Sequence, residues 1–68
     1  MTKIIEFETY NSLDKKNYKR YINAEHIVEL QKLPVGNESE SLTRIKLVNG
    51  DFMDIKTSIS DTINQINN

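Results

Sequence analysis

The sequence predicts a small α+β domain, in which a mostly antiparallel sheet of four to five short strands precedes one C-terminal helix. Three observations lead to this fold class. Apolar and polar residues alternate in several short runs, which is the period of a half-buried strand. Asn49 and Gly50 stand between two such runs, as they do in many β-hairpins. From Ser58 onward the apolar residues change to the period of a helix.

The N-terminal part of the chain predicts a first pair of strands. Residues 3–10 alternate, with Ile5 and Phe7 on the face that we expect to be buried. Residues 11–17 combine turn-forming and charged side chains and therefore predict a loop. A second strand is expected over residues 18–22.

Asn23 interrupts the alternation and predicts a short helical turn. Its side chain can accept a hydrogen bond from a backbone N–H two or three residues later, so we expect one helical or 3₁₀ turn over residues 23–26. A third strand follows over residues 27–33. Within it, Val28 and Leu30 are expected to share the apolar face.

Pro34 is expected to end the third strand because proline has no backbone N–H to donate to a sheet. Residues 34–41 are polar and acidic and predict a mobile surface loop. The fourth strand is predicted over residues 42–48 and the fifth over residues 51–56.

The hairpin between these last two strands allows two registers, and side-chain parity favours one of them. A two-residue loop of Asn49 and Gly50 would mix apolar and charged residues on both faces. A three-residue loop that also includes Val48 gives one apolar face and one charged face. Glycine then occupies the left-handed bulge position that follows a type I turn. The pairs predicted by this register are Leu47 with Asp51, Ile45 with Met53, Thr43 with Ile55 and Arg44 with Asp54.

The C-terminal helix is predicted from one apolar stripe and a capping signal. Ile59, Ile63 and Ile66 follow the i, i+4, i+7 spacing of one helix face. Ser58 is a suitable N-cap, and Asp61 lies three residues later, where a carboxylate favours the first turn. Such a short helix is weak alone, so we expect its isoleucine stripe to pack on the sheet.

Size and composition indicate a single domain over residues 1–68 that would gain stability from self-association. Below about 70–80 residues one core rarely supplies more than ~3–5 kcal/mol of stability. The chain contains no cysteine, so no disulfide can reinforce that core. Self-association buries additional apolar surface, and we therefore expect a homo-oligomer.

The charge and hydropathy of the chain predict a cytoplasmic protein with no membrane partner. Glu6 and Glu8 interrupt the only apolar run near the N-terminus, unlike a signal peptide. No run approaches the ~20 apolar residues that cross a bilayer. The net charge of −1 does not match nucleic acid or anionic lipid. The many Ile, Asn and Lys residues are typical of AT-rich coding sequences, as in low-GC bacteria and their phages.

The side chains that carry chemistry predict no catalytic, cofactor-binding or metal site. His26 is the only histidine, and its sequence neighbours offer only Glu25 and Glu29 as partners. The two glycines, Gly36 and Gly50, are too far apart for a phosphate-binding loop. We therefore expect a non-enzymatic protein without a cofactor, and His26 is expected to have a surface or turn-packing role.

One candidate interface is a set of residues on the charged face of the predicted hairpin. Phe52 falls on this face, so its ring is expected to be exposed. An exposed Phe is either scattered surface apolarity or part of a contact with a subunit or partner. The residues proposed for this interface, which we call the Phe52 face, are Arg44, Lys46, Val48 and Phe52.

A second candidate is a cationic and aromatic segment in residues 14–21. Cations interleaved with aromatic rings can meet phosphates and stack bases. The alternative is a solvated hairpin tip with no ligand. The candidate anion-binding residues, which we call the basic hairpin, are Lys15, Lys16, Tyr18, Lys19, Arg20 and Tyr21.

From Tyr21 onward the chain resembles the small FlbD-type proteins of bacterial flagellar operons. The resemblance rests on YINAEHIVEL, TRIKLVNGDFMDIKTS and the helix opening SISDTI, and covers about two thirds of the chain. Similar YIN openings also occur in LytTR-type DNA-binding domains. The first strand and the long loop over residues 34–41 depart from the FlbD pattern. The resemblance implies the fold, no enzymatic activity and no particular site residues.

These observations predict a small interaction protein, expected to be a homo-oligomeric regulator or inhibitor that binds another protein. The alternative is a module that binds or sequesters nucleic acid or a nucleotide through the basic hairpin. An enzyme would require a catalytic site assembled without a recognisable motif.

Overall fold

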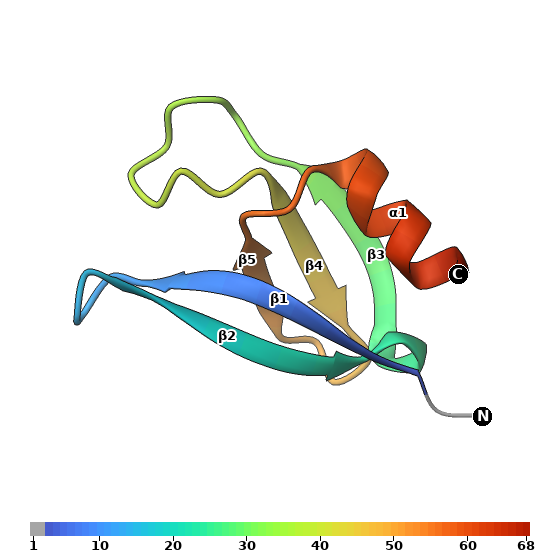
Figure 1. Cartoon of the computed structure of the whole chain (residues 1–68). Helices are drawn as coiled ribbons and strands as arrows, with labels where there is room; N and C mark the ends of the chain where they lie inside the picture. The colour runs from blue at the N-terminus through green and yellow to red at the C-terminus, as the bar shows by residue number, and fades with distance from the viewer. Residues whose placement is uncertain (1–2) are drawn as a thin grey trace.

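The computed structural model describes residues 3–68, in which a five-stranded antiparallel sheet is followed by one C-terminal helix (Figure 1). The predicted α+β fold class is therefore confirmed. The elements in chain order are β1 (Ile4–Asn11), β2 (Lys16–Asn23), the 3₁₀ helix η1 (Ala24–His26), β3 (Ile27–Lys32), β4 (Thr43–Leu47), β5 (Phe52–Ile55) and α1 (Ile59–Asn67).

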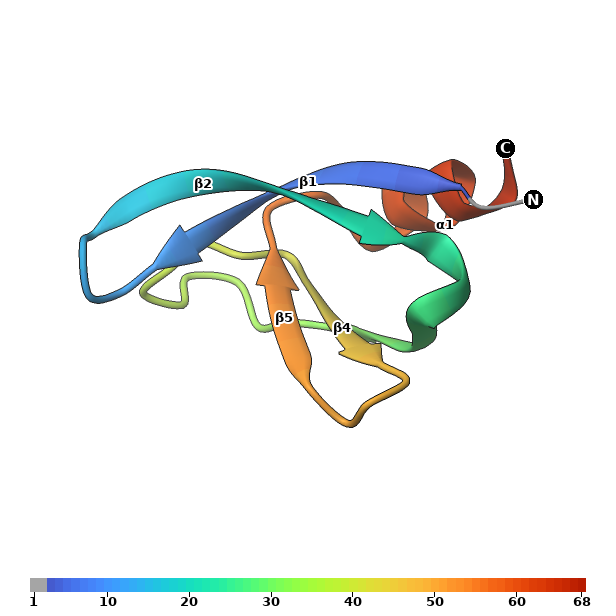
Figure 2. The same cartoon turned by 90° about the horizontal axis from the view of Figure 1, so that it is seen from below.

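The strand order in the sheet is β2-β1-β5-β4-β3, so the two edge strands, β2 and β3, are consecutive in the chain. The short η1 segment connects these opposite edges and brings them close together, and the sheet is therefore strongly curled. The predicted turn is confirmed: Asn23 Oδ1 accepts from the N–H of Glu25 at 2.9 Å. The N–H of Ala24 donates to Lys3 O at 2.8 Å, which anchors η1 to the start of β1. In Figure 2, β1 and β2 run along the top of the view and the β4–β5 hairpin lies beneath them.

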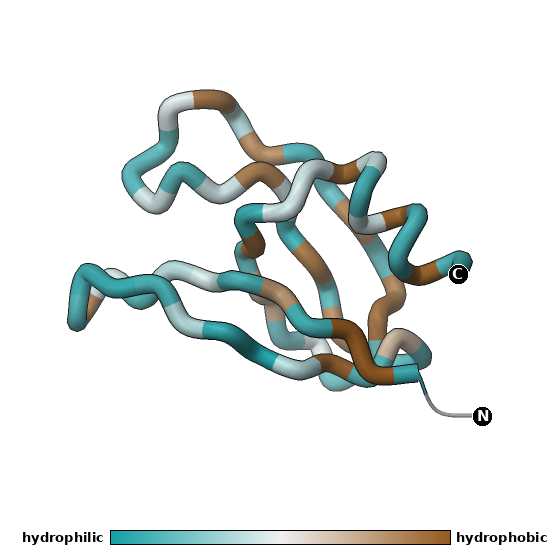
Figure 3. Tube along the Cα trace, viewed as in Figure 1, coloured by the Kyte–Doolittle hydropathy of each residue, from teal (hydrophilic) through white to brown (hydrophobic). Residues whose placement is uncertain are grey.

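The core lies inside this curl and is small. Its buried apolar side chains come from the three central strands, as the alternation in β1 and the hairpin register predict: Ile5, Phe7, Ile45, Met53 and Ile55. Figure 3 shows the apolar segments gathered in the strands near α1, whereas most of the far part of the β1–β2 hairpin is hydrophilic. The hairpin therefore extends beyond the core.

The β4–β5 hairpin has the predicted three-residue register. Lys46 pairs with Phe52, and the ladder continues to Thr43 and Ile55. The N–H of Leu47 donates to Asp51 O at 2.8 Å. Gly50 has a φ of +92°, which is the left-handed conformation expected at the bulge position.

The predicted bounds of the first hairpin are wrong. Residues 11–17 were expected to be a loop, but Asn11 pairs with Lys16, and only residues 12–15 form the turn. The strand expected over residues 18–22 runs from Lys16 to Asn23. Most side chains of β2 are exposed, so they show no alternating burial pattern by which a strand could be predicted. Backbone pairing with β1 keeps this segment in the strand conformation.

The predicted face of Val28 in β3 is also wrong, because a β-bulge separates Ile27 from Glu29. The extra residue, Val28, is 56 % exposed. Leu30 packs against the core as predicted, but its companion there is Ile27 rather than Val28. A bulge shifts the side-chain alternation by one residue, so simple parity assigned Val28 to the wrong face.

The helix α1 has the predicted cap but a different buried face. Ser58 Oγ accepts from the N–H of Asp61 at 3.2 Å. Thr62 is buried, whereas Ile63 is 43 % exposed. Ile66 is half-buried and packs against the core, so the helix faces the sheet through Thr62 and Ile66 rather than through a stripe that includes Ile63.

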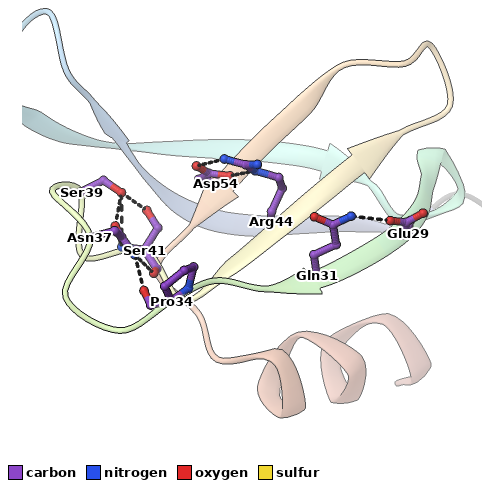
Figure 4. Close-up of polar contacts among 8 residues, drawn as sticks. All are labelled: Glu29, Gln31, Pro34, Asn37, Ser39, Ser41, Arg44 and Asp54. Carbon is purple, nitrogen blue, oxygen red and sulfur yellow. Dashed lines mark hydrogen bonds and ion pairs between the residues drawn. The ribbon is translucent and has the colours of Figure 1, made fainter.

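The loop between β3 and β4 is organised around one side chain. Asn37 Nδ2 donates to the carbonyl oxygens of Pro34 and Ser41, both at 2.8 Å. Ser39 Oγ donates to Asn37 Oδ1 at 2.7 Å (Figure 4). Ser41 is buried, although this segment was predicted to lie on the surface. The loop itself is confirmed, and its mobility stays a prediction.

Candidate functional site

Phe52 projects from the outer face of the β4–β5 hairpin, opposite the core. Its side chain is 57 % exposed. The guanidinium carbon of Arg44 and the Nζ atom of Lys46 each lie 5.9 Å from the ring centroid. The ring is thus flanked by two cations at cation–π distance, and Phe52 presents an aromatic surface in a positively charged setting.

Arg44 is fixed on this face by the cross-strand pair that the register predicted. Its Nε atom donates to Asp54 Oδ1 at 2.8 Å, and its Nη2 atom donates to Asp54 Oδ2 at 3.2 Å (Figure 4). The hydrogen bond to Asp54, followed by the charge of that carboxylate, raises the pKa of Arg44. This bidentate pair holds the guanidinium beside the ring of Phe52.

Val48, the remaining residue of the Phe52 face, is separated from the other three. It is 65 % exposed at the hairpin turn. It lines a hollow of about 280 Å³ together with Tyr21 and His26. The fold therefore places Val48 at a different depression from the one that Phe52 lines.

The residues of the basic hairpin do not form one surface. Phe7 pairs with Arg20 and Thr9 with Tyr18, so these two β2 side chains lie on the same face as the core. Lys19 and Tyr21 lie on the opposite face. A carboxylate of β1 engages both of them there: Tyr21 Oη donates to Glu6 Oε1 at 3.1 Å, and Lys19 Nζ lies 3.8 Å from that oxygen.

Tyr18 is further tied to the turn of its own hairpin. Its hydroxyl donates to Asp14 Oδ2 at 2.6 Å. This hydrogen bond, followed by slight burial, raises the pKa of Tyr18 above the ordinary value of 10.0. The bond orients the phenol relative to the turn.

A groove of about 740 Å³ lies between the β1–β2 hairpin and β5. It brings together part of each candidate set, because Tyr18 and Arg20 line it together with Arg44 and Phe52. A second cavity of about 480 Å³ continues from it toward the β3–β4 loop. The residues that line both cavities are Tyr10, Ser12, Arg44 and Asp54.

Sequence reasoning did not assign Tyr10, Leu13 or Asp54 to this site. Leu13 is 91 % exposed at the hairpin turn and lines the groove. No local motif joins these residues into a site, because the groove arises where segments far apart in sequence meet. Two signals were available: Leu13 is an apolar residue in an otherwise polar turn, and the predicted register already placed Asp54 opposite Arg44.

Among residues 3–68, no group of three His, Cys, Asp or Glu side chains is placed to hold a metal ion. No helix in the described part of the chain has the length and apolarity needed to cross a bilayer.

Comparison with protein-family models, curated proteins and solved structures finds no match. The resemblance to FlbD-type proteins therefore stays a prediction.

Proposed function

We propose that this chain is a non-enzymatic interaction protein, a regulator or inhibitor that docks on another protein through Phe52 and the groove beside it. The observation that carries the proposal is the exposed ring of Phe52 between Arg44 and Lys46. Aromatic residues and arginine are enriched among the residues that dominate protein–protein binding energy. Their convergence at one groove supports a docking surface.

The charge of the groove supports a partner with acidic character. The residues that line the larger cavity include two arginines and one aspartate, so their net charge is positive. Asp54 forms an ion pair with Arg44 and neutralises its charge, so the charge of Arg20 is the one available to a ligand. Complementary charge promotes encounter and selects partners. We therefore expect an acidic protein surface that also supplies an apolar contact for Phe52.

The test is affinity capture from a lysate of the organism that carries the chain, with and without nuclease. Phe52→Ala should weaken binding to the captured protein by about 2 kcal/mol if Phe52 is a buried anchor in the complex. Ile4→Ala is the matched control, because Ile4 has the same exposed fraction of 57 % and lies in β1, outside the groove.

Three outcomes of this experiment would contradict the proposal. They are capture that is lost on nuclease treatment, capture that survives Phe52→Ala unchanged, and equal losses for Phe52→Ala and Ile4→Ala. The expected result is nuclease-resistant capture that depends on Phe52 alone.

A second candidate function is binding of nucleic acid or a nucleotide by the basic hairpin. Its support is that Tyr18 and Arg20 share one face of β2 and line the groove, where a base and a phosphate could both be contacted. Against it, Lys19 and Tyr21 lie on the other face, beside Glu6. Lysine on an edge strand also serves to prevent pairing with other strands.

Neutralising the basic hairpin separates the two functions. The variant replaces Lys15, Lys16, Lys19 and Arg20 together. Loss of a steeply salt-dependent complex in this variant, with Phe52→Ala still binding, would favour the phosphate-bearing ligand. We expect Phe52→Ala to have the larger effect.

A further inference from the structure

The strand β5 is paired unequally on its two sides. On one side β4 pairs with all four of its residues, from Phe52 to Ile55. On the other side, within residues 3–68, the ladder with β1 consists of the single pair Thr9 and Ile55. Beyond that pair β1 continues into the projecting hairpin, visible in Figure 1. The Phe52 end of β5 is thus an open strand edge.

The direction of the backbone groups follows from the hydrogen bonds on either side of β5. Leu47 N–H donates to Asp51 O at 2.8 Å, toward β4, and Lys56 N–H donates to Glu8 O at 3.0 Å, toward β1. In a strand, alternate residues direct their N–H and C=O groups to opposite sides. The N–H and C=O groups of Phe52 therefore point away from β4, into the groove.

An open strand edge beside a groove can accept another strand. Unpaired N–H and C=O groups form a template for main-chain pairing, and many peptide-binding domains recognise an extended segment in this way. The groove adds side-chain selectivity, because Arg20 and Tyr18 face this edge from the hairpin. Side chains of an added strand would alternate between its two faces.

We propose that the groove receives an extended acidic segment of the partner protein as an added strand on the Phe52 edge of β5. This inference rests on the proposed protein-binding function and specifies its mode. A carboxylate of the segment pairs with Arg20, and an apolar side chain packs on the Phe52 ring. Glu38 lines the second cavity and repels carboxylates there. The acidic residues of the bound segment are therefore placed at the end of the groove that contains Arg20.

The probe is a synthetic peptide that alternates valine with aspartate, tested against the full chain by fluorescence anisotropy. The comparison peptides are the valine–lysine version and a valine–aspartate version with alternate backbone amides methylated. We expect binding of the first peptide only, because methylation removes the donors that strand pairing needs. In isotope-labelled protein, binding should shift the backbone amide resonance of Phe52 and slow its hydrogen exchange.

Two substitutions in β2 test the role of charge. Arg20→Gln should weaken binding of the acidic peptide about tenfold, which corresponds to the loss of one charge-assisted hydrogen bond. Lys19→Gln is the matched control, because it removes the same charge from the opposite face of the same strand. Both side chains are exposed, so both variants should fold normally.

The proposal is overturned if the acidic peptide does not bind, if the lysine or methylated peptide binds equally well, or if Lys19→Gln matches Arg20→Gln. These results leave the proposed function intact when capture still depends on Phe52. Capture that is independent of Phe52 would remove the proposed function, whatever the peptides do.

Discussion

Gly50 determines the geometry of the β4–β5 hairpin and, through it, the position of Phe52. Its φ of +92° lies in the region that side chains other than glycine rarely adopt. A Cβ atom at this position would meet nothing within 4 Å, so the requirement for glycine is conformational rather than steric. The resulting three-residue turn places Phe52 opposite Lys46 and on the outer face.

We expect Gly50→Ala to lower the free energy of unfolding by about 1 kcal/mol, because alanine is strained at positive φ. Denaturant unfolding measures the change. Gly50→Asn is the control, since asparagine tolerates the left-handed region better, and it should retain more stability. Equal stability of the wild type and Gly50→Ala would contradict the bulge conformation.

At the scale of elements, α1 shows how packing selects among apolar residues. Three isoleucines follow helical spacing, yet Thr62 is fully buried and Ile63 is 43 % exposed. The Thr62 hydroxyl donates to Ser58 O at 2.8 Å, so the buried polar group is satisfied within the helix. Its small side chain lets the helix lie close to the sheet, where α1 contacts β3.

The orientation of α1 predicts unequal roles for two isoleucines. Ile66→Ala should lower the free energy of unfolding by roughly 2 kcal/mol, because Ile66 packs against the core. Ile63→Ala should change it by no more than about 0.5 kcal/mol, as is usual for surface positions. Chemical denaturation of both variants compares them directly. A larger loss for Ile63→Ala would show that α1 packs through the face predicted from the sequence.

At the scale of the whole molecule, a small core is combined with a large exposed apolar surface. Only five apolar side chains are buried among residues 3–68. Ile4, Val28, Val48 and Phe52 are all more than half exposed. The free edge of β2 carries Lys16, Lys19 and Arg20, whose like charges oppose pairing between two β2 edges. Association is therefore expected through apolar faces rather than through this edge.

We expect the chain to be a dimer or a larger homo-oligomer at micromolar concentration, because association buries apolar surface that the small core leaves exposed. Sedimentation velocity across a concentration series measures the state, and thermal unfolding at the same concentrations should show a rising midpoint. A stable monomer with a high, concentration-independent melting temperature would contradict the expectation.

The sequence by itself determined the features that depend on neighbours along the chain. The alternation in β1, the Asn23 turn, the Gly50 bulge and the Ser58 cap each involve residues a few positions apart. Their hydrogen bonds and burial periods are local, so composition and spacing were sufficient to predict them. The hairpin register followed for the same reason, because one turn connects its two strands.

Only the tertiary structure decided where distant segments meet. The bulge at Val28 depends on pairing with β4, and the burial of Thr62 depends on how α1 lies against the sheet. The groove exists because β1 leaves β5 after the pair of Thr9 and Ile55. This divergence brings Arg20 of one hairpin and Phe52 of the other to the same cavity. The curl and the strand order depend on apolar residues from distant parts of the chain being buried against one another, and no local pattern of residues encodes them.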